Sequence, residues 1–388
     1  MRREPFALYV HIPFCSRKCP YCDFNTYAVE GAPEQLYTEA LCRELDYYAE
    51  DPIFQGRQVS SVFFGGGTPS LFSPKAIGCV LQAIEGHFPI IPCSEITLEA
   101  NPGGVSLERL QGYRAIGINR LSFGVQSFSA KTLTLLGREH SPEQAMECVA
   151  LALAAGISNV SIDIIFGVSG QDVSHVQRDL EVAFRLPIKH LSTYALSIEP
   201  GTPFFQRQQR GVLSLPPEDA VVEMMYEIPR HAALQGFNRY EISNYAKPGF
   251  ESKHNSAYWR GVDYLGIGAG AHSYVLKSDM PDIDAVRWTT LAQPLAYMKV
   301  AGTTAVVSWR EDLDQKGLQF EFFYLGLRRS EGIDLHDFLK HFGAEALHRY
   351  ELVLQDLQSE GFVHRENDTV TLTAQGIVLS DSVYERLA

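Results

Sequence analysis

Three of the chain's cysteines are crowded into residues 11–24, which read HIPFCSRKCPYCDF. Thiolates spaced four and three residues apart on one loop can bind three irons of a cubane cluster, which leaves the fourth iron for an outside molecule. The alternative is a zinc site completed by His11 or by a distant residue, since tetrahedral zinc also takes cysteine and histidine. No paired zinc spacing follows nearby, so the segment favours a 4Fe-4S cluster on Cys15, Cys19 and Cys22.

The other four cysteines are scattered, and we assign no role to Cys42, Cys79, Cys93 or Cys148. A buried free thiol is the common explanation for a single cysteine in a helical pattern. The total of seven is odd, which argues for thiol or metal chemistry in a reducing compartment.

A glycine run and several polar residues fall on expected strands or just beyond them. Residues 64–69 read FGGGTP, and a glycine run lets the backbone approach a ligand closely, although tight turns use glycine equally well. Glu99, Gln126 and Asp163 lie in or just beyond apolar strands, where a polar side chain needs a ligand or an internal partner. We expect ligand contacts, because such residues gather at the strand ends of barrels.

The spacing Cys-x3-Cys-x-aromatic-Cys resembles that of radical S-adenosylmethionine (SAM) enzymes. In that family the open iron chelates the amino and carboxylate groups of SAM, and an electron from the cluster cleaves the sulfonium. The resemblance continues in the glycine run and in the segments LEANP, FGVQSF, LGREH and SIDIIFG. It implies that SAM is bound by Tyr9, Tyr21, Gly66, Gly67, Thr68, Glu99, Gln126, Arg138 and Asp163.

Nearly the whole chain resembles the subfamily that contains oxygen-independent coproporphyrinogen III dehydrogenases and HemW-type haem chaperones. The dehydrogenases carry a long extension before the cluster and a further cysteine just after it. Here the cluster segment begins at Cys15, and Cys22 is followed by Asp23. Residues 254–259, HNSAYW, match the His-Asn-x-x-Tyr-Trp signature of the chaperones. These features favour the chaperone branch.

The resemblance implies a third ligand, haem, at His254, Tyr258 and Trp259. A histidine nitrogen can ligate haem iron and aromatic rings can pack on a porphyrin; the alternative is a loop histidine beside two core anchors. We therefore expect a chaperone that delivers haem to an acceptor, such as a respiratory protein, and that needs an electron donor. The alternatives are coproporphyrinogen III oxidation and a radical reaction on an unrelated substrate.

The composition of the chain disfavours some classes of binding partner. The net charge of -13 over 388 residues, without a long basic run, disfavours nucleic acid. No apolar signal core follows the first residues and no run is long enough to span a membrane. We expect a cytoplasmic protein, and such a protein can still contact a membrane protein transiently.

Strand-like runs alternate with helical patterns up to about residue 200, which predicts a parallel sheet with crossover helices. The expected strands are 7–12, 59–64, 95–99, 120–125, 160–166 and 190–197. The expected helices are 33–48, 74–87, 107–116, 141–155 and 173–186. The fold class is therefore α/β, and the resemblance implies a partial (βα)6 TIM-like radical SAM barrel.

The rest of the chain divides into two further expected parts. Residues 201–312 form an accessory segment that closes the barrel of residues 1–200 and carries the HNSAYW motif. Residues 313–388 show helices followed by a small hairpin, which predicts a C-terminal winged-helix-like domain. Such domains often bind DNA, but this one has no excess of basic residues.

Overall fold

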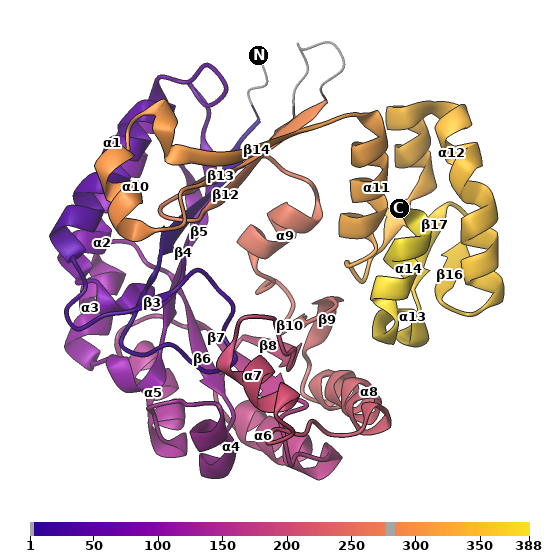
Figure 1. Cartoon of the computed structure of the whole chain (residues 1–388), viewed down its shortest axis with the longest axis horizontal. Helices are drawn as coiled ribbons and strands as arrows, with labels where there is room; N and C mark the ends of the chain where they lie inside the picture. The colour runs from indigo at the N-terminus through magenta and orange to yellow at the C-terminus, as the bar shows by residue number, and fades with distance from the viewer. Residues whose placement is uncertain (1–3, 277–283) are drawn as a thin grey trace.

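The structure, a computed structural model, describes residues 4–276 and 284–388 (Figure 1). Within these residues, twelve strands form one mixed sheet in the order β14-β13-β12-β11-β1-β4-β5-β6-β7-β8-β10-β9. The six parallel strands that the sequence predicts are adjacent in it: β1 (Phe6–Ile12), β4 (Val59–Gly66), β5 (Ile90–Ala100), β6 (Arg120–Gln126), β7 (Asn159–Phe166) and β8 (His190–Ala195). The predicted α/β fold class is confirmed.

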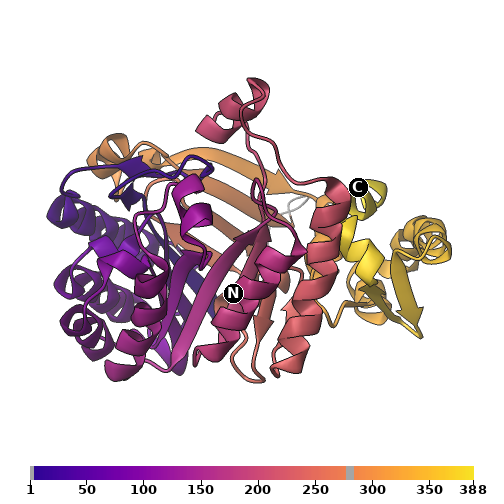
Figure 2. The ribbon, with the colours of Figure 1, turned by 90° about the horizontal axis from the view of Figure 1, so that it is seen from below.

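Helices cross between these strands and cover the outer face of the curved sheet (Figures 1 and 2). They are α1 (Glu34–Ala49), α2 (Pro74–His87), α3 (Leu107–Ala115), α4 (Ala130–Leu135), α5 (Pro142–Ala154) and α6 (Val173–Arg185). Helix α5 begins as its sequence predicts, with Ser141 and Gln144 forming a capping box and Pro142 in the first turn. The strands and the buried faces of α1, α2, α3, α5 and α6 share one apolar core.

The segment after β8 extends the sheet at both edges. Strands β9 (Asn238–Glu241) and β10 (Asn244–Ala246) pair beyond β8. On the other side β11 (Tyr264–Ile267) runs parallel to β1, and β12 (His272–Leu276), β13 (Ala285–Thr290) and β14 (Val307–Leu313) follow antiparallel. The helices of this segment are α7 (Pro203–Gln209), α8 (Glu218–Leu234), α9 (Lys253–Trp259) and α10 (Pro294–Val300).

The C-terminal part has a hydrophobic core of its own, which includes Phe323, Phe338 and Leu357. Its elements are α11 (Gln315–Gly326), β15 (Ile333–Asp334), α12 (Leu335–Ser359), β16 (Val363–Glu366), β17 (Thr369–Leu372), α13 (Ala374–Val378) and α14 (Ser380–Leu387). A non-helical Gly343 interrupts α12, and its φ of 82° suits glycine. Helices α9 and α11 bring this part against the sheet domain.

Short elements complete the fold. Strands β2 (Phe14–Cys15) and β3 (Tyr27–Ala28) pair within the cysteine loop, and the 3-10 turns are η1 (Pro69–Leu71), η2 (Pro102–Gly104) and η3 (Thr304–Val306). In the part of the chain that the structure describes, no helix has the length and apolar character to cross a membrane.

Candidate functional site

The three clustered cysteines line one cavity of about 430 Å³ at the carboxyl ends of the parallel strands. Their loop follows β1 and is closed by the pairing of Cys15 with Ala28. All three thiols are free and partly buried, and burial raises the pKa of Cys15 and Cys22. Metal binding would offset the cost of burying a charged thiolate, because the metal binds the deprotonated sulfur.

Three thiols from one loop are a donor set that fits a cubane. Among the described residues, no three histidine, cysteine or acidic side chains are arranged to hold one metal ion. A cubane binds each thiolate to a different iron, so its ligands need not converge on one point. Three cysteines on one cavity wall, beside open space, therefore suit three irons and an outside ligand for the fourth.

The glycine run at the end of β4 is explained first by internal packing. A Cβ on Gly66 would lie 2.5 Å from His11, and one on Gly67 would lie 2.6 Å from the backbone oxygen of Phe14. Gly66 also has a φ of 111°, which disfavours other residues. Gly66 and Gly67 nevertheless line the cysteine cavity, so their backbone is available to a ligand there.

Glu99, Gln126 and Asp163 meet on the same cavity, although they come from three strands. Two of them are also bridged internally. Glu99 accepts a bond from the Gly66 amide (3.1 Å) and Asp163 accepts one from Ser122 (3.3 Å). Both carboxylates therefore have an internal partner and also line the cavity, and their contact with a ligand stays a prediction.

The electrostatics of this group are unusual. Burial, followed by the nearby charge of Asp163, raises the pKa of Glu99 to about 8. Burial also raises the pKa of Asp163. Gln126 has a φ of 67°, a conformation that a non-glycine residue adopts rarely and that often marks a functional position. The cavity thus holds acidic groups that a bound cation would stabilise.

Arg138 connects this group to the cysteines. Its Nη1 lies 3.6 Å from Cys19 Sγ, and its Nη2 donates to Asn101 Oδ1 at 2.5 Å. Asn101 Nδ2 donates to Thr68 Oγ1 (3.0 Å), which donates in turn to Cys15 Sγ (3.6 Å). Sequence reasoning did not single out Asn101, although its place directly after β5, two residues beyond Glu99, could have indicated it.

The two tyrosines that are predicted to bind SAM, Tyr9 and Tyr21, line different cavities. Tyr21 lines the cysteine cavity and packs near Phe204. Tyr9 lines a different cavity, and its hydroxyl bonds to His11 Nδ1 at 3.1 Å. Phe24, which is 63% exposed, lines both cavities.

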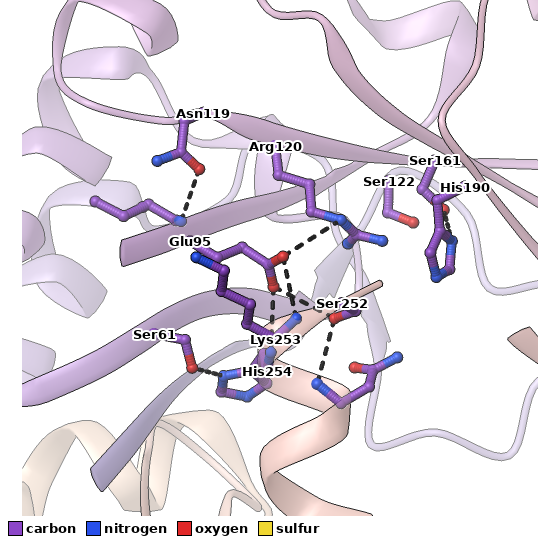
Figure 3. Close-up of polar contacts among 12 residues, drawn as sticks. Ser61, Glu95, Asn119, Arg120, Ser122, Ser161, His190, Ser252, Lys253 and His254 are labelled. Atoms are coloured by element: carbon purple, nitrogen blue, oxygen red, sulfur yellow. Dashed lines mark hydrogen bonds and ion pairs between the residues drawn. The ribbon is translucent and has the colours of Figure 1, made fainter. Parts of the chain in front are cut away.

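The HNSAYW motif forms α9, whose start is anchored to β5 by Glu95 (Figure 3). Glu95 Oε1 accepts bonds from the Ser252 hydroxyl (3.3 Å) and the His254 amide (3.2 Å), and Oε2 accepts from the Lys253 amide (3.2 Å). Arg120 lies 3.8 Å from the same carboxylate. A buried acid at a helix start is well placed, because amides point at it there.

His254 lies inside this anchor and is 1% exposed. Its Nδ1 bonds to Ser61 Oγ at 2.9 Å (Figure 3). Its Nε2 bonds to Tyr258 Oη at 2.8 Å, so both ring nitrogens are engaged. Burial, with Arg120 nearby, lowers the pKa of His254 to about 3. The neutral ring fixes α9 on β4 and sets the position of Tyr258.

Tyr258 and Trp259 face a second cavity, of about 740 Å³, between the sheet domain and α11. Aromatic rings dominate its wall: Tyr9, Tyr258, Trp259, Tyr264, Tyr274, Phe320 and Tyr324 contribute. Arg328 stacks over Trp259 with its guanidinium carbon 4.4 Å from the ring centre. Pockets of this size and apolar character commonly hold a ligand.

Comparisons with known proteins agree with this architecture. The Radical SAM superfamily matches residues 9–183, and the HemN C-terminal domain matches residues 313–379. The solved coproporphyrinogen III oxidase (HemN) of Escherichia coli aligns with a TM-score of 0.82 over 99% of this chain and 90% of its own. Its sequence identity is 23%, so this likeness concerns the fold.

Curated relatives are more similar in sequence. The heme chaperone HemW of Escherichia coli is 36% identical over 99% of this chain and 98% of its own. HemW of Bacillus subtilis is 34% identical over 97% of this chain and 98% of its own. A mitochondrial radical S-adenosyl methionine domain-containing protein 1 of Danio rerio is 34% identical over 97% of this chain and 85% of its own. The chain therefore belongs to the HemW family of radical SAM proteins.

Proposed function

We propose that this chain is a haem chaperone, which carries a 4Fe-4S cluster, binds SAM at that cluster and transfers haem to an acceptor protein. The observation that carries the proposal is the pairing of a cysteine-lined cavity with an adjoining aromatic cavity. HemW proteins similar over nearly the full length are named heme chaperones, which supports haem as the cargo.

In this proposal Cys15, Cys19 and Cys22 hold the cluster. When bound, the cluster supplies a low-potential electron and an open iron for the amino and carboxylate groups of SAM. The residues proposed to hold SAM are Tyr21, Gly66, Gly67, Thr68, Glu99, Gln126, Arg138 and Asp163, all of which line the cysteine cavity. Tyr9 lines the aromatic cavity instead, and its hydroxyl bonds to His11, so we assign it an indirect role at the SAM site.

Haem is proposed to occupy the aromatic cavity, where Tyr258 and Trp259 offer ring surface to a porphyrin. His254, with both ring nitrogens bonded, holds Tyr258 in place. The partners of the proposed cycle are an electron donor and a haem-accepting protein, such as a respiratory protein.

The test uses one anaerobically reconstituted sample of the full chain for two measurements. Haem titration should reach about one equivalent per chain, as expected for one specific site. With SAM and a reduced cluster present, the same sample should leave coproporphyrinogen III unconverted. Sustained turnover would replace the chaperone proposal by the enzyme alternative.

A further inference from the structure

Three histidines stand at or near the aromatic cavity, and they differ in how their ring nitrogens are used. His11 bonds to Tyr9 Oη (3.1 Å) and to the Asn25 backbone oxygen (3.0 Å). His254 is likewise bonded at both nitrogens. His272 bonds through Nδ1 alone, and its Nε2 has no hydrogen-bond partner among the described residues. An iron could reach only this ring without breaking a bond.

His272 is also held by a hydrogen bond at its other ring nitrogen. It opens β12, where its register partner on β13 is Thr289, and Thr289 Oγ1 lies 2.9 Å from its Nδ1. A hydrogen bond at one ring nitrogen is the usual way that proteins fix a metal-ligating histidine and select the other nitrogen for the metal. Burial and the charge of Arg287 lower the pKa of His272, which favours the neutral ring that binds metal.

The surroundings suit an iron porphyrin. His272 is an exposed residue of the cavity wall, which it shares with the rings of Tyr264 and Tyr274. Arg287, from the same wall, pairs with Glu321 and lies 3.5 Å from Glu311. A guanidinium beside an aromatic surface offers a partner for the carboxylates of a porphyrin, although these must compete with the two glutamates.

We infer that haem, the cargo in the proposed function on which this inference rests, lies in the aromatic cavity with Nε2 of His272 as an axial ligand of its iron. The inference assigns the iron contact to β12 and leaves His254 as a positioning residue for α9. It follows from the free nitrogen, the orienting bond and the aromatic wall together.

The test compares variants of the full, cluster-loaded chain titrated with ferric haem. Absorption is recorded as a difference against the haem-free sample, and the haem iron is followed by electron paramagnetic resonance. His272→Ala should lose the spectrum of histidine-ligated haem and weaken binding by about tenfold or more. Added imidazole should restore the ligand signal, because it supplies the missing nitrogen.

Two further variants complete the design. His364→Ala removes an exposed histidine from β16, and its haem spectrum and affinity should equal those of the wild type. Leu325→Trp fills part of the aromatic cavity and should weaken haem binding without removing the proposed ligand. Its residual bound haem should keep the histidine-ligated spectrum.

The outcomes separate the two proposals. If wild type binds haem and His272→Ala shows the same spectrum and affinity, the ligand inference is overturned and the chaperone function stands. If Leu325→Trp binds haem as tightly as wild type, the cavity is the wrong one. If the wild type binds no haem, the proposed function falls and the inference falls with it.

Discussion

The guanidinium of Arg138 lies 3.6 Å from the sulfur of Cys19, with Nη1 as the nearest donor. The same side chain is held by Asn101 and by the Gly124 backbone oxygen, at 2.5 and 2.6 Å. This places a fixed positive charge beside a proposed cluster ligand, in a partly buried environment where charges interact strongly.

Arg138→Gln should therefore make the midpoint potential of the reconstituted cluster more negative, because a nearby positive charge stabilises the reduced form. Iron content should remain that of wild type, since the guanidinium binds no metal. SAM affinity should fall by about tenfold through loss of a charged donor. Arg138→Lys, which keeps the charge, should retain most of the potential; an equal shift in both variants would contradict this explanation.

Loss of the three clustered thiols should remove the cluster. Wild type should reconstitute with about four irons and four sulfides per chain, as for a cubane. The triple variant Cys15→Ala, Cys19→Ala and Cys22→Ala should retain neither, as measured by iron and sulfide assay. Cys79→Ala, at an exposed position on α2, is the matched control and should load fully. Full loading of the triple variant would refute the cluster assignment.

His254 should contribute to stability more than to haem ligation. His254→Ala removes two buried hydrogen bonds, to Ser61 and Tyr258, and should lower the free energy of unfolding by about 2–4 kcal/mol. Ser61→Ala removes one of them and should cost about 1 kcal/mol. Thermal and denaturant unfolding measure both. Equal stability of His254→Ala and wild type would contradict the anchoring role.

His254 should also make the stability of the folded chain depend on pH. The pKa of His254 is about 3 in the folded chain and ordinarily 6.5, so the unfolded chain binds more protons between these values. Stability should therefore fall as pH decreases from about 6.5. His254→Gln should reduce that slope without abolishing it, because burial also lowers the pKa of His190 and His140. An unchanged slope in the variant would count against the neutral buried ring.

SAM binding should release a proton from Glu99. With its pKa raised to about 8, this carboxyl is mostly protonated at neutral pH. The iron-bound amino group of SAM would donate hydrogen bonds that favour the charged carboxylate and lower that pKa. Calorimetry at pH 7 in buffers of different ionisation enthalpy measures the proton released. Glu99→Gln should bind SAM more weakly and release less; equal release by both proteins would point to another group.

The sequence predicts the six parallel strands well because each is a local apolar run bounded by turn residues. It does not reveal β11, a strand of four residues in a glycine-rich segment. That strand is defined by its pairing with β1, in which Leu265 lies opposite Leu8. Contacts so distant along the chain leave no local periodicity to detect.

The candidate functional site could also be predicted only in part, because some of its contacts join residues far apart along the chain. Glu99, near the end of β5, and Asp163, within β7, line one cavity, as expected for polar residues on neighbouring parts of a barrel sheet. The surroundings of His254 could not be predicted, because Glu95 and Ser61 reach it from strands far earlier in the chain. His272 was missed because a single histidine in the run GAGAHS has no informative neighbours; its free nitrogen is visible only in three dimensions.

Phe24, Gly66 and Glu99 each line both cavities, so one thin wall separates the two. Two ligands that share a wall are thermodynamically linked whenever filling one side shifts a residue of that wall. Linkage is reciprocal, so SAM would change the affinity for cargo by the same factor as cargo changes the affinity for SAM. In the proposed function a carrier must bind its cargo and later release it, and SAM bound in the cysteine cavity would change the affinity for haem across this shared wall.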